Sequence, residues 1–493
     1  MRRAGWVALV GTALLGQACD ARLVHVTRWE GSAGQGGAAG GAGSAGNAGN
    51  AGSAAGACSA TLAERLTVAN VTLDVPVRYR RSGYDLVPDD ERLALSLDER
   101  GWPQVAWLEN AGSLVHVTPL TPALGRAAPD AVLAGYEVAG LVASAGGAML
   151  LVRRDDPGTP LADPAAHGQL ATAAVLVGLR QGTEVFASAL TGTSSITLPS
   201  EPGAFDCAPG LRGALSSDGA RLGAYFTVHG CEGDPHASFY GDKLVFTDLQ
   251  GGWLSGGWDW RCGIAMGMRL QAAAGDFAAL CLSDGVPLSR LSVLASGVDA
   301  VQLATEKGGI GYSAGNLGGM ARGGDGSYFV AWSSRGTVGT GTATTTERAA
   351  HDLALVHLSA ARTVEGERQW LTDTPDVDEV NVHLAPYGAT RLLLLWDEVT
   401  ELDCHTTSCL GTYGGTYARL LDLTGQPVTE PERLPAPPNA DDELQLSAEG
   451  DLLWAFAADP ARSYASPITK DASGIPQLPE VTELSVARLK LCE

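Results

Sequence analysis

LALSLDERGWPQVAW, residues 93–107, is the stretch that decides the fold. Mostly apolar residues on both sides of a polar turn at Gly101 are typical of two adjoining β-strands, because glycine readily adopts the backbone conformation of a tight turn. The second apolar run ends in Trp107. The stretch therefore predicts a β-hairpin.

The same unit recurs along the chain, and this repeat indicates the architecture. The copies lie around Gly101, Gly147, Gly219, Gly275, Gly326, Gly388 and Gly450. A third apolar strand follows each hairpin, and a fourth follows most of them. Seven such sheets predict an all-β fold, a seven-bladed β-propeller over residues 58–493, because radial packing buries both faces of each sheet. A six-bladed ring and a pair of β-sandwich domains are the alternatives.

The two ends of this region predict how the ring closes. The last unit stops after its third strand, Leu484 to Leu489, and the sequence ends at Glu493. The apolar stretch Leu66 to Val77 precedes the first hairpin and can supply the missing fourth strand. Cys58 and Cys492 flank this closure, and we expect them to form a disulfide.

Composition argues against one class of partner. Asp and Glu outnumber Lys and Arg by 55 to 33, which gives a formal net charge of −22. A chain this acidic is poorly suited to neutralising phosphates, so we expect no nucleic-acid partner, and a charged partner should be cationic. Beyond the extreme N-terminus, no apolar run approaches the roughly 20 residues of a membrane-spanning helix.

The N-terminus predicts export. Residues 1–18 place Arg2 and Arg3 before a short apolar stretch, which is typical of a signal peptide. The segment Gly16-Gln17-Ala18-Cys19 resembles a bacterial lipobox, although Gly16 stands where such boxes usually carry Leu. Lipidation of Cys19 would leave eight of the nine cysteines, an even number that can pair in an oxidising environment. A secreted protein without a lipid is the alternative.

A low-complexity segment follows. Gly31 to Ala57 contains only Gly, Ala, Ser, Asn and Gln, so it predicts a disordered tether with a span of roughly 30 Å. Lipobox and tether together resemble surface lipoproteins of high-GC Gram-negative bacteria, the myxobacterial ones especially. The resemblance covers residues 1–57. It implies that residues 19–57 are anchor and linker, and that the chain is held through Cys19 at the outer membrane or the periplasmic face of the cell envelope.

The remaining cysteines predict local disulfides. The expected pairs are Cys207 with Cys231, Cys262 with Cys281, and Cys404 with Cys409. The members of each pair are close in sequence, but other pairings of eight cysteines stay open.

One face of the predicted ring should carry the long connections, among them a loop from Asp397 to Thr416, and two segments on it are candidate ligand-binding sites. The candidates are Trp258, Asp259 and Trp260, and the acidic set Asp373, Asp376, Asp378 and Glu379. Aromatic rings can stack on a sugar or a peptide, but tryptophans at blade junctions also pack in cores. Closely spaced carboxylates suit calcium. Their spacing is not that of a calcium loop, so a solvated acidic loop is the alternative, the metal is left unknown and no other cofactor is predicted.

These observations favour a monomeric binding or scaffolding module at the cell surface. It would recognise a protein or glycan through its acidic face and contact the membrane only through its lipid. The alternative is a glycan-active hydrolase or lyase with its site on the same face. We assign no catalytic residues, because no motif has the sequence context that such chemistry requires.

Overall fold

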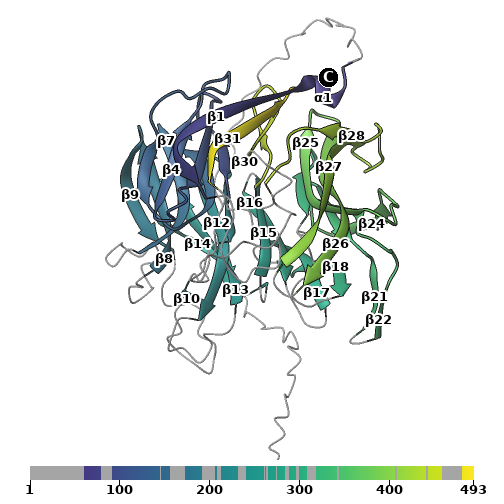
Figure 1. Cartoon of the computed structure of the whole chain (residues 1–493). Coiled ribbons are helices and arrows are strands. Elements are labelled where there is room, and N and C mark those ends of the chain that lie inside the picture. The colour runs from purple at the N-terminus through teal and green to yellow at the C-terminus, as the bar shows by residue number, and fades with distance from the viewer. Residues whose placement is uncertain are drawn as a thin grey trace, which may run out of the picture. The chain divides into compact units, whose positions relative to one another are not determined.

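The computed structural model describes a ring of β-sheets (Figure 1). The described residues are 60–78, 92–144, 146–155, 172–190, 206–207, 212–230, 240–259, 261–262, 265–273, 275–283, 288–295, 299–307, 318–340, 343–405, 408–439, 442–457 and 480–492. Seven sheets follow one another along the chain, and each forms one blade. This confirms the predicted all-β, seven-bladed β-propeller.

The strands of each blade are consecutive in sequence, apart from the last blade. Blade 1 has β2 (Ala94–Leu97), β3 (Pro103–Leu108), β4 (Leu114–Pro119) and β5 (Ala131–Ala134). Blade 2 has β6 (Glu137–Ser144), β7 (Gly147–Asp155), β8 (Thr172–Arg180) and β9 (Thr183–Ala189). Blade 3 has β10 (Asp206–Cys207), β11 (Gly213–Ser217), β12 (Arg221–Gly230), β13 (Tyr240–Asp248) and β14 (Trp253–Asp259). Blade 4 has β15 (Ala265–Ala273), β16 (Asp276–Ser283), β17 (Leu288–Ala295) and β18 (Val301–Lys307).

The second half of the chain continues the pattern. Blade 5 has β19 (Gly319–Arg322), β20 (Tyr328–Ser334), β23 (Asp352–Leu358) and β24 (Val364–Trp370), with the separate hairpin β21 (Thr337–Thr340) and β22 (Ala343–Thr346) inserted. Blade 6 has β25 (Asp378–Tyr387), β26 (Arg391–His405), β27 (Ser408–Asp422) and β28 (Glu432–Leu434). Blade 7 has β29 (Gln445–Leu446), β30 (Leu452–Ala457), β31 (Val481–Leu489) and, from the start of the propeller, β1 (Leu66–Val77).

The ring closes as the sequence predicts. β1 pairs antiparallel with β31, from Leu66 opposite Leu489 to Val77 opposite Val481. Just before β1 lies the four-residue helix α1 (Leu62–Arg65). Among the described residues, no helix is long and apolar enough to cross a membrane.

The hydrophobic core consists of seven main clusters, and each is shared by two successive blades. Because side chains alternate along a strand, one strand serves two interfaces. In β3, Val105 and Trp107 pack with blade 7, whereas Ala106 and Leu108 pack with blade 2. This explains why the middle strands are apolar throughout. The aromatic residues that end the predicted units, such as Trp107, are at most 1% exposed at the four clearest copies.

The glycines that mark the repeat lie in the hairpin turns. Gly101 and Gly450 have φ angles of +76° and +86°, which glycine adopts without strain. In the second unit the turn residue with positive φ is Gly146 (+74°), and the predicted Gly147 is the first residue of β7. In each blade, the turns between first and second strands and between third and fourth strands emerge on one side of the ring, here called the turn face. The other side, the connection face, carries the second-to-third and blade-to-blade connections.

The described cysteines bear on the predicted disulfides. Cys262 and Cys281 are bonded, which confirms that pair. Cys492 is disulfide-bonded, but Cys58 lies outside the described residues, as do Cys19 and Cys231. The backbones of Cys404 and Cys409 lie opposite each other in the β26–β27 register, and Cys207 lies in β10.

Candidate functional site at the junction of blades 5 and 6

The predicted acidic segment joins blade 5 to blade 6 on the connection face. Residues 371–377 connect β24 to β25, and Asp378 and Glu379 begin β25. Asp373 and Asp376 are exposed. Asp378 and Glu379 are only 7% and 1% exposed, because a strand that begins inside the ring places its first side chains at the blade interface. Only half of the predicted set therefore faces solvent.

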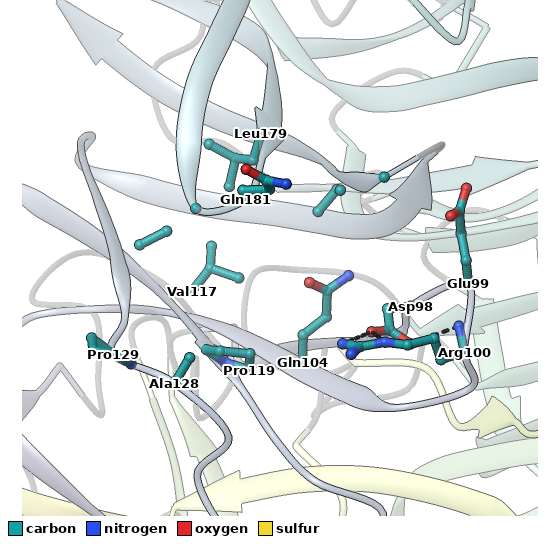
Figure 2. Close-up of a pocket in the computed structure, with 15 residues that line it drawn as sticks. Asp98, Glu99, Arg100, Gln104, Val117, Pro119, Ala128, Pro129, Leu179 and Gln181 are labelled. Carbon is teal, nitrogen blue, oxygen red and sulfur yellow. Dashed lines mark hydrogen bonds and ion pairs between the residues drawn. The ribbon is translucent and has the colours of Figure 1, made fainter.

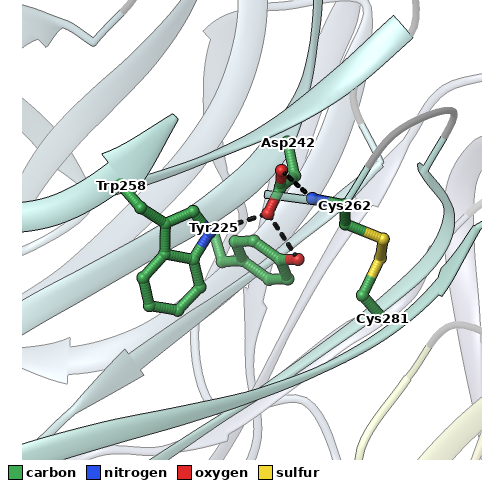
Figure 3. The surroundings of a disulfide bond; sticks show 5 residues. All are labelled: Tyr225, Asp242, Trp258, Cys262 and Cys281. Atoms are coloured by element: carbon green, nitrogen blue, oxygen red, sulfur yellow. Dashed lines mark hydrogen bonds between the residues drawn. A yellow bond between two sulfur atoms is a disulfide. The ribbon is translucent and has the colours of Figure 1, made fainter. Parts of the chain in front are cut away.

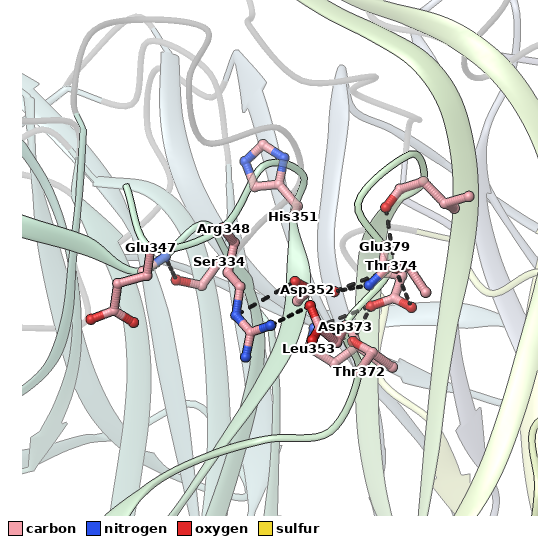
Figure 4. Close-up of polar contacts among 12 residues, drawn as sticks. Ser334, Glu347, Arg348, His351, Asp352, Leu353, Thr372, Asp373, Thr374 and Glu379 are labelled. Carbon is pink, nitrogen blue, oxygen red and sulfur yellow. Dashed lines mark hydrogen bonds and ion pairs between the residues drawn. The ribbon is translucent and has the colours of Figure 1, made fainter. Parts of the chain in front are cut away.

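The buried Glu379 carboxylate accepts three hydrogen bonds. Its donors are the Thr372 hydroxyl, the Thr374 hydroxyl at 3.2 Å and the Leu353 amide at 3.2 Å (Figure 4). Burial raises the pKa of Glu379 to about 7, despite the lowering effect of the threonine hydrogen bonds, and the nearby charge of Asp352 also raises it. Glu379 therefore exchanges a proton near neutral pH.

The adjacent residue, Asp378, has a different environment. Its Oδ1 lies 2.7 Å from Nδ1 of His351 and accepts the His351 amide at 3.0 Å. A guanidinium nitrogen of Arg335 lies 3.8 Å away. Burial raises the pKa of Asp378, but the hydrogen bonds from His351 and the charge of Arg335 outweigh it, and the pKa lies below its usual value. Two neighbouring carboxyl groups thus differ in protonation near neutral pH.

Arg348 links the buried carboxylates to the exposed ones. Its Nε lies 3.7 Å from Asp352, and a terminal nitrogen pairs with Asp373 (Figure 4). The guanidinium also lies over the Trp370 ring, 4.6 Å from its centroid. Within the described part of the chain, no group of three or more His, Cys, Asp or Glu side chains is arranged to hold a metal ion. The cluster can hold a proton at Glu379 and present the exposed Asp376 carboxylate to a cation.

The second predicted segment lies at the end of β14, and its described residues are buried. Trp258 is 9% exposed, packs edge-on against Tyr225 and donates its indole N–H to Asp242 at 2.7 Å (Figure 3). Asp259 is 8% exposed and lies 3.3 Å from Lys243. Trp258 therefore packs in the core, which is the alternative that the sequence left open. Trp260 lies outside the described residues.

Asp242 organises this corner of the ring. Besides Trp258, the Tyr225 hydroxyl at 2.9 Å and the Cys262 amide at 2.6 Å donate to it (Figure 3). Burial raises the pKa of Asp242 to about 6, although the donors lower it. The carboxylate fixes the blade 3 to blade 4 connection beside the Cys262–Cys281 disulfide.

The centre of the ring holds polar residues that the sequence analysis missed. Blades 4 and 7 are not neighbours, so a contact between them crosses the central channel. Such a contact is made by Glu443, just before β29, which accepts the Leu270 amide of β15 at 3.1 Å. The preceding residue, Asp442, pairs at 2.9 Å with Arg92, which lies just before β2.

The channel also holds a buried histidine. Nε2 of His383, in β25, lies 3.0 Å from Oδ1 of Asn381. Burial and the positive charge of Arg269 hold the pKa of His383 well below its usual value, so the ring is neutral. These residues come from separate segments and form no motif. The one sequence signal that could have identified a channel residue is a charged residue inside an apolar strand, such as Arg269 in AMGMRLQAA of β15.

Comparisons with known proteins find similar solved structures at low sequence identity and no similar sequence. No family model and no curated protein sequence matches it. A structure of the polysaccharide lyase Uly1 is 10% identical, covers 86% of this chain and 99% of its own, and gives a TM-score of 0.44. The Dos1 propeller is 8% identical over 84% of this chain and 95% of its own, with a TM-score of 0.35. A sialidase from Trypanosoma rangeli is 10% identical over 68% and 58%, with a TM-score of 0.33.

Proposed function

We propose that this chain is an exported, lipid-anchored β-propeller that acts as a binding or scaffolding module at the cell surface. It uses its connection face to hold a cationic protein or glycan partner. The observation that carries the proposal is that longer hairpins project from the connection face than from the turn face. The sequence predicts a loop from Asp397 to Thr416, but β26 and β27 instead continue as a hairpin of 15 residues each, whereas β28 has three residues. The same face carries the inserted β21–β22 hairpin.

The turn face is plainer. Most of its described turns are short and closed by backbone hydrogen bonds, as from Asp98 to Trp102 and from Asp248 to Gly252. The longer connections on this face are residues 120–130 and residues 423–431. Rigid sheets that support long projections on one side are a common arrangement for binding sites. This asymmetry supports recognition through the connection face.

Charge supports a cationic partner. Asp376 and Glu401 are exposed on the connection face, in a chain whose net charge is −22, whereas the exposed Asp373 is paired with Arg348. A field of this sign attracts cations and speeds their encounter, more strongly at low salt. The lipid at Cys19 and the tether of residues 31–57 would hold this face at the envelope while leaving it free to reorient.

A charge-reversal pair tests the proposal. Asp376→Lys with Glu401→Lys changes two exposed acids on the connection face, and Glu99→Lys with Asp299→Lys makes the same change in net charge on the turn face. We expect the first pair to weaken binding of an oligolysine peptide and of the envelope partner by about tenfold at low salt, since two exposed charge contacts are worth about 1–2 kcal/mol. Calorimetry and quantitative capture by the full chain measure this. Equal losses of affinity in the two double variants would show that binding is not directed to the connection face.

The anchor has its own test. Cys19→Ala should move the chain from the detergent phase to the aqueous phase, because the lipid would supply its membrane affinity. Unchanged partitioning would remove the lipid from the proposal and leave the binding face unaffected.

The polar channel supports an enzymatic role as the second candidate function. Asp442, Glu443, His383 and two arginines gather at the ring axis, where a hydrolase or lyase could use carboxylates and a neutral imidazole. Their burial and mutual hydrogen bonds favour a structural role. Turnover of a polysaccharide by the parent but not by a folded His383→Gln variant would reverse this preference.

A further inference from the structure

A cleft lies on the turn face, between blades 1 and 2, opposite the face proposed for partner binding. Its volume is about 490 Å³, within the range of roughly 300–1,000 Å³ that is usual for small-molecule sites. The β2–β3 turn and the β4–β5 connection line it from blade 1, and the β6–β7 and β8–β9 turns from blade 2 (Figure 2). Much of its wall is aliphatic, from residues such as Val117, Pro119 and Leu179.

A buried carboxamide points into this cleft. Gln104 is 8% exposed, and its amide stands between the floor from blade 1 and Gln181 of blade 2 (Figure 2). Its Nε2 donates to the Ser96 hydroxyl at 3.0 Å. No described residue donates to its Oε1, so one acceptor and the second N–H of a mostly buried amide are left for a ligand.

Gln181 supplies a second carboxamide from the opposite wall. It occupies the turn between β8 and β9 with φ of +50°, followed by Gly182 with φ of +77°. A glycine would be less strained than glutamine at this backbone conformation. The side chain is exposed and borders the cleft.

The charges of the cleft select against anions. The guanidinium of Arg100 is already bound by Asp98, whose Oδ2 accepts from two of its nitrogens at 2.9 and 2.6 Å. Glu99 adds a further negative charge at the rim. An anionic ligand would thus meet a net negative lining with its one arginine engaged.

We infer that this cleft is a binding site for a neutral sugar, one or two rings of a glycan. Hydroxyl groups both donate and accept, and so do the two carboxamides. The C–H faces of a sugar ring can pack on the aliphatic wall, and a neutral ligand is not repelled by the negative rim. The site is separate from the connection face and does not depend on the proposed function.

The test uses the full chain with cellotriose, maltotriose and triacetylchitotriose as probes, followed by ligand-observed NMR and calorimetry. We expect at least one to bind at concentrations up to about 10 mM. Gln104→Met retains the side-chain length and removes the amide, and it should weaken binding about tenfold, the value of one or two hydrogen bonds. Gln181→Gly should also weaken binding, and because glycine suits its backbone the variant folds even if Gln104→Met does not.

Gln426→Met is the matched control, since Gln426 is exposed on the same face in blade 6. It should bind the sugar as the parent does. Three results would overturn the inference: no probe binds, Gln104→Met and Gln181→Gly both bind the sugar as tightly as the parent does, or cadaverine binds in place of the sugars and is lost in Glu99→Gln. The last result would assign the cleft to a cationic ligand.

Discussion

Arg92 connects four blades through a single side chain. Besides its salt bridge to Asp442, it donates to the carbonyls of Ala139 in blade 2 and Gly213 in blade 3. Arg92→Met would remove the salt bridge of the buried Asp442 carboxylate to Arg92 and the two hydrogen bonds to the carbonyls. We expect a loss of about 3–5 kcal/mol in the free energy of unfolding, measured by urea denaturation. The control is Arg100→Met, where the side chain is 63% exposed in its pair with Asp98, and the loss should be at most about 1 kcal/mol. Similar losses in both variants would show that Arg92 does not hold the ring.

Glu379 predicts a pH dependence of stability. Its pKa is about 7 in the folded chain and near 4.5 in the unfolded chain, so the folded state binds the extra proton between these values. Its contribution is therefore fully present below about pH 4.5 and is lost as the pH rises through 7, a change of about 2–4 kcal/mol. Glu379→Gln removes this titration and keeps a neutral side chain of the same size. The variant should match the parent at pH 5 and exceed it in stability at pH 8, by urea denaturation at both pH values. A constant difference between the two proteins would contradict this account.

At the scale of elements, the local pattern of the sequence predicts the strands and turns. It does not predict which residues at a strand end are exposed or paired, because this depends on the residue at which the strand begins and on its register. Glycines such as Gly101 predict turns because few other residues adopt positive φ. The pattern could not separate Asp376 from Asp378, because exposure changes at the residue where β25 begins. It also took residues 397–416 for a loop, since their polar and glycine-rich composition hides a continuous hairpin in which Asp397 pairs with Thr416.

The closing strand β1 allows a matched pair of variants within one element. Leu73 is 5% exposed in the cluster shared by blades 7 and 1, whereas Val68 is 38% exposed. Leu73→Ala should lower the free energy of unfolding by about 2–4 kcal/mol in a single cooperative transition, and Val68→Ala should change it little. Protease resistance of every blade should fall together in Leu73→Ala. Loss of resistance confined to residues 60–78 would show that β1 is an appendage and not part of the ring.

For the whole molecule, the repeat predicts the ring and its closure, but the polar channel follows only from the closed structure. Arg92 and Asp442 are 350 residues apart, and no local pattern relates them. Each lies in a short segment just before the first strand of its blade, and the seven-fold arrangement brings these segments to one axis. The same arrangement divides the surface into a face of mostly short turns and a face with long hairpins.

The central claim is that the partner docks on the connection face, and site-specific photo-crosslinking tests it most directly. A photoreactive amino acid replaces Glu401 on the connection face or Asp299 on the turn face of the full chain, in cells whose envelope carries it. Both positions are exposed, so neither substitution should disturb the core. We predict a discrete cross-linked product from position 401 that mass spectrometry assigns to one envelope component, and none from position 299. The same product from both positions, or a product from position 299 alone, would contradict the account.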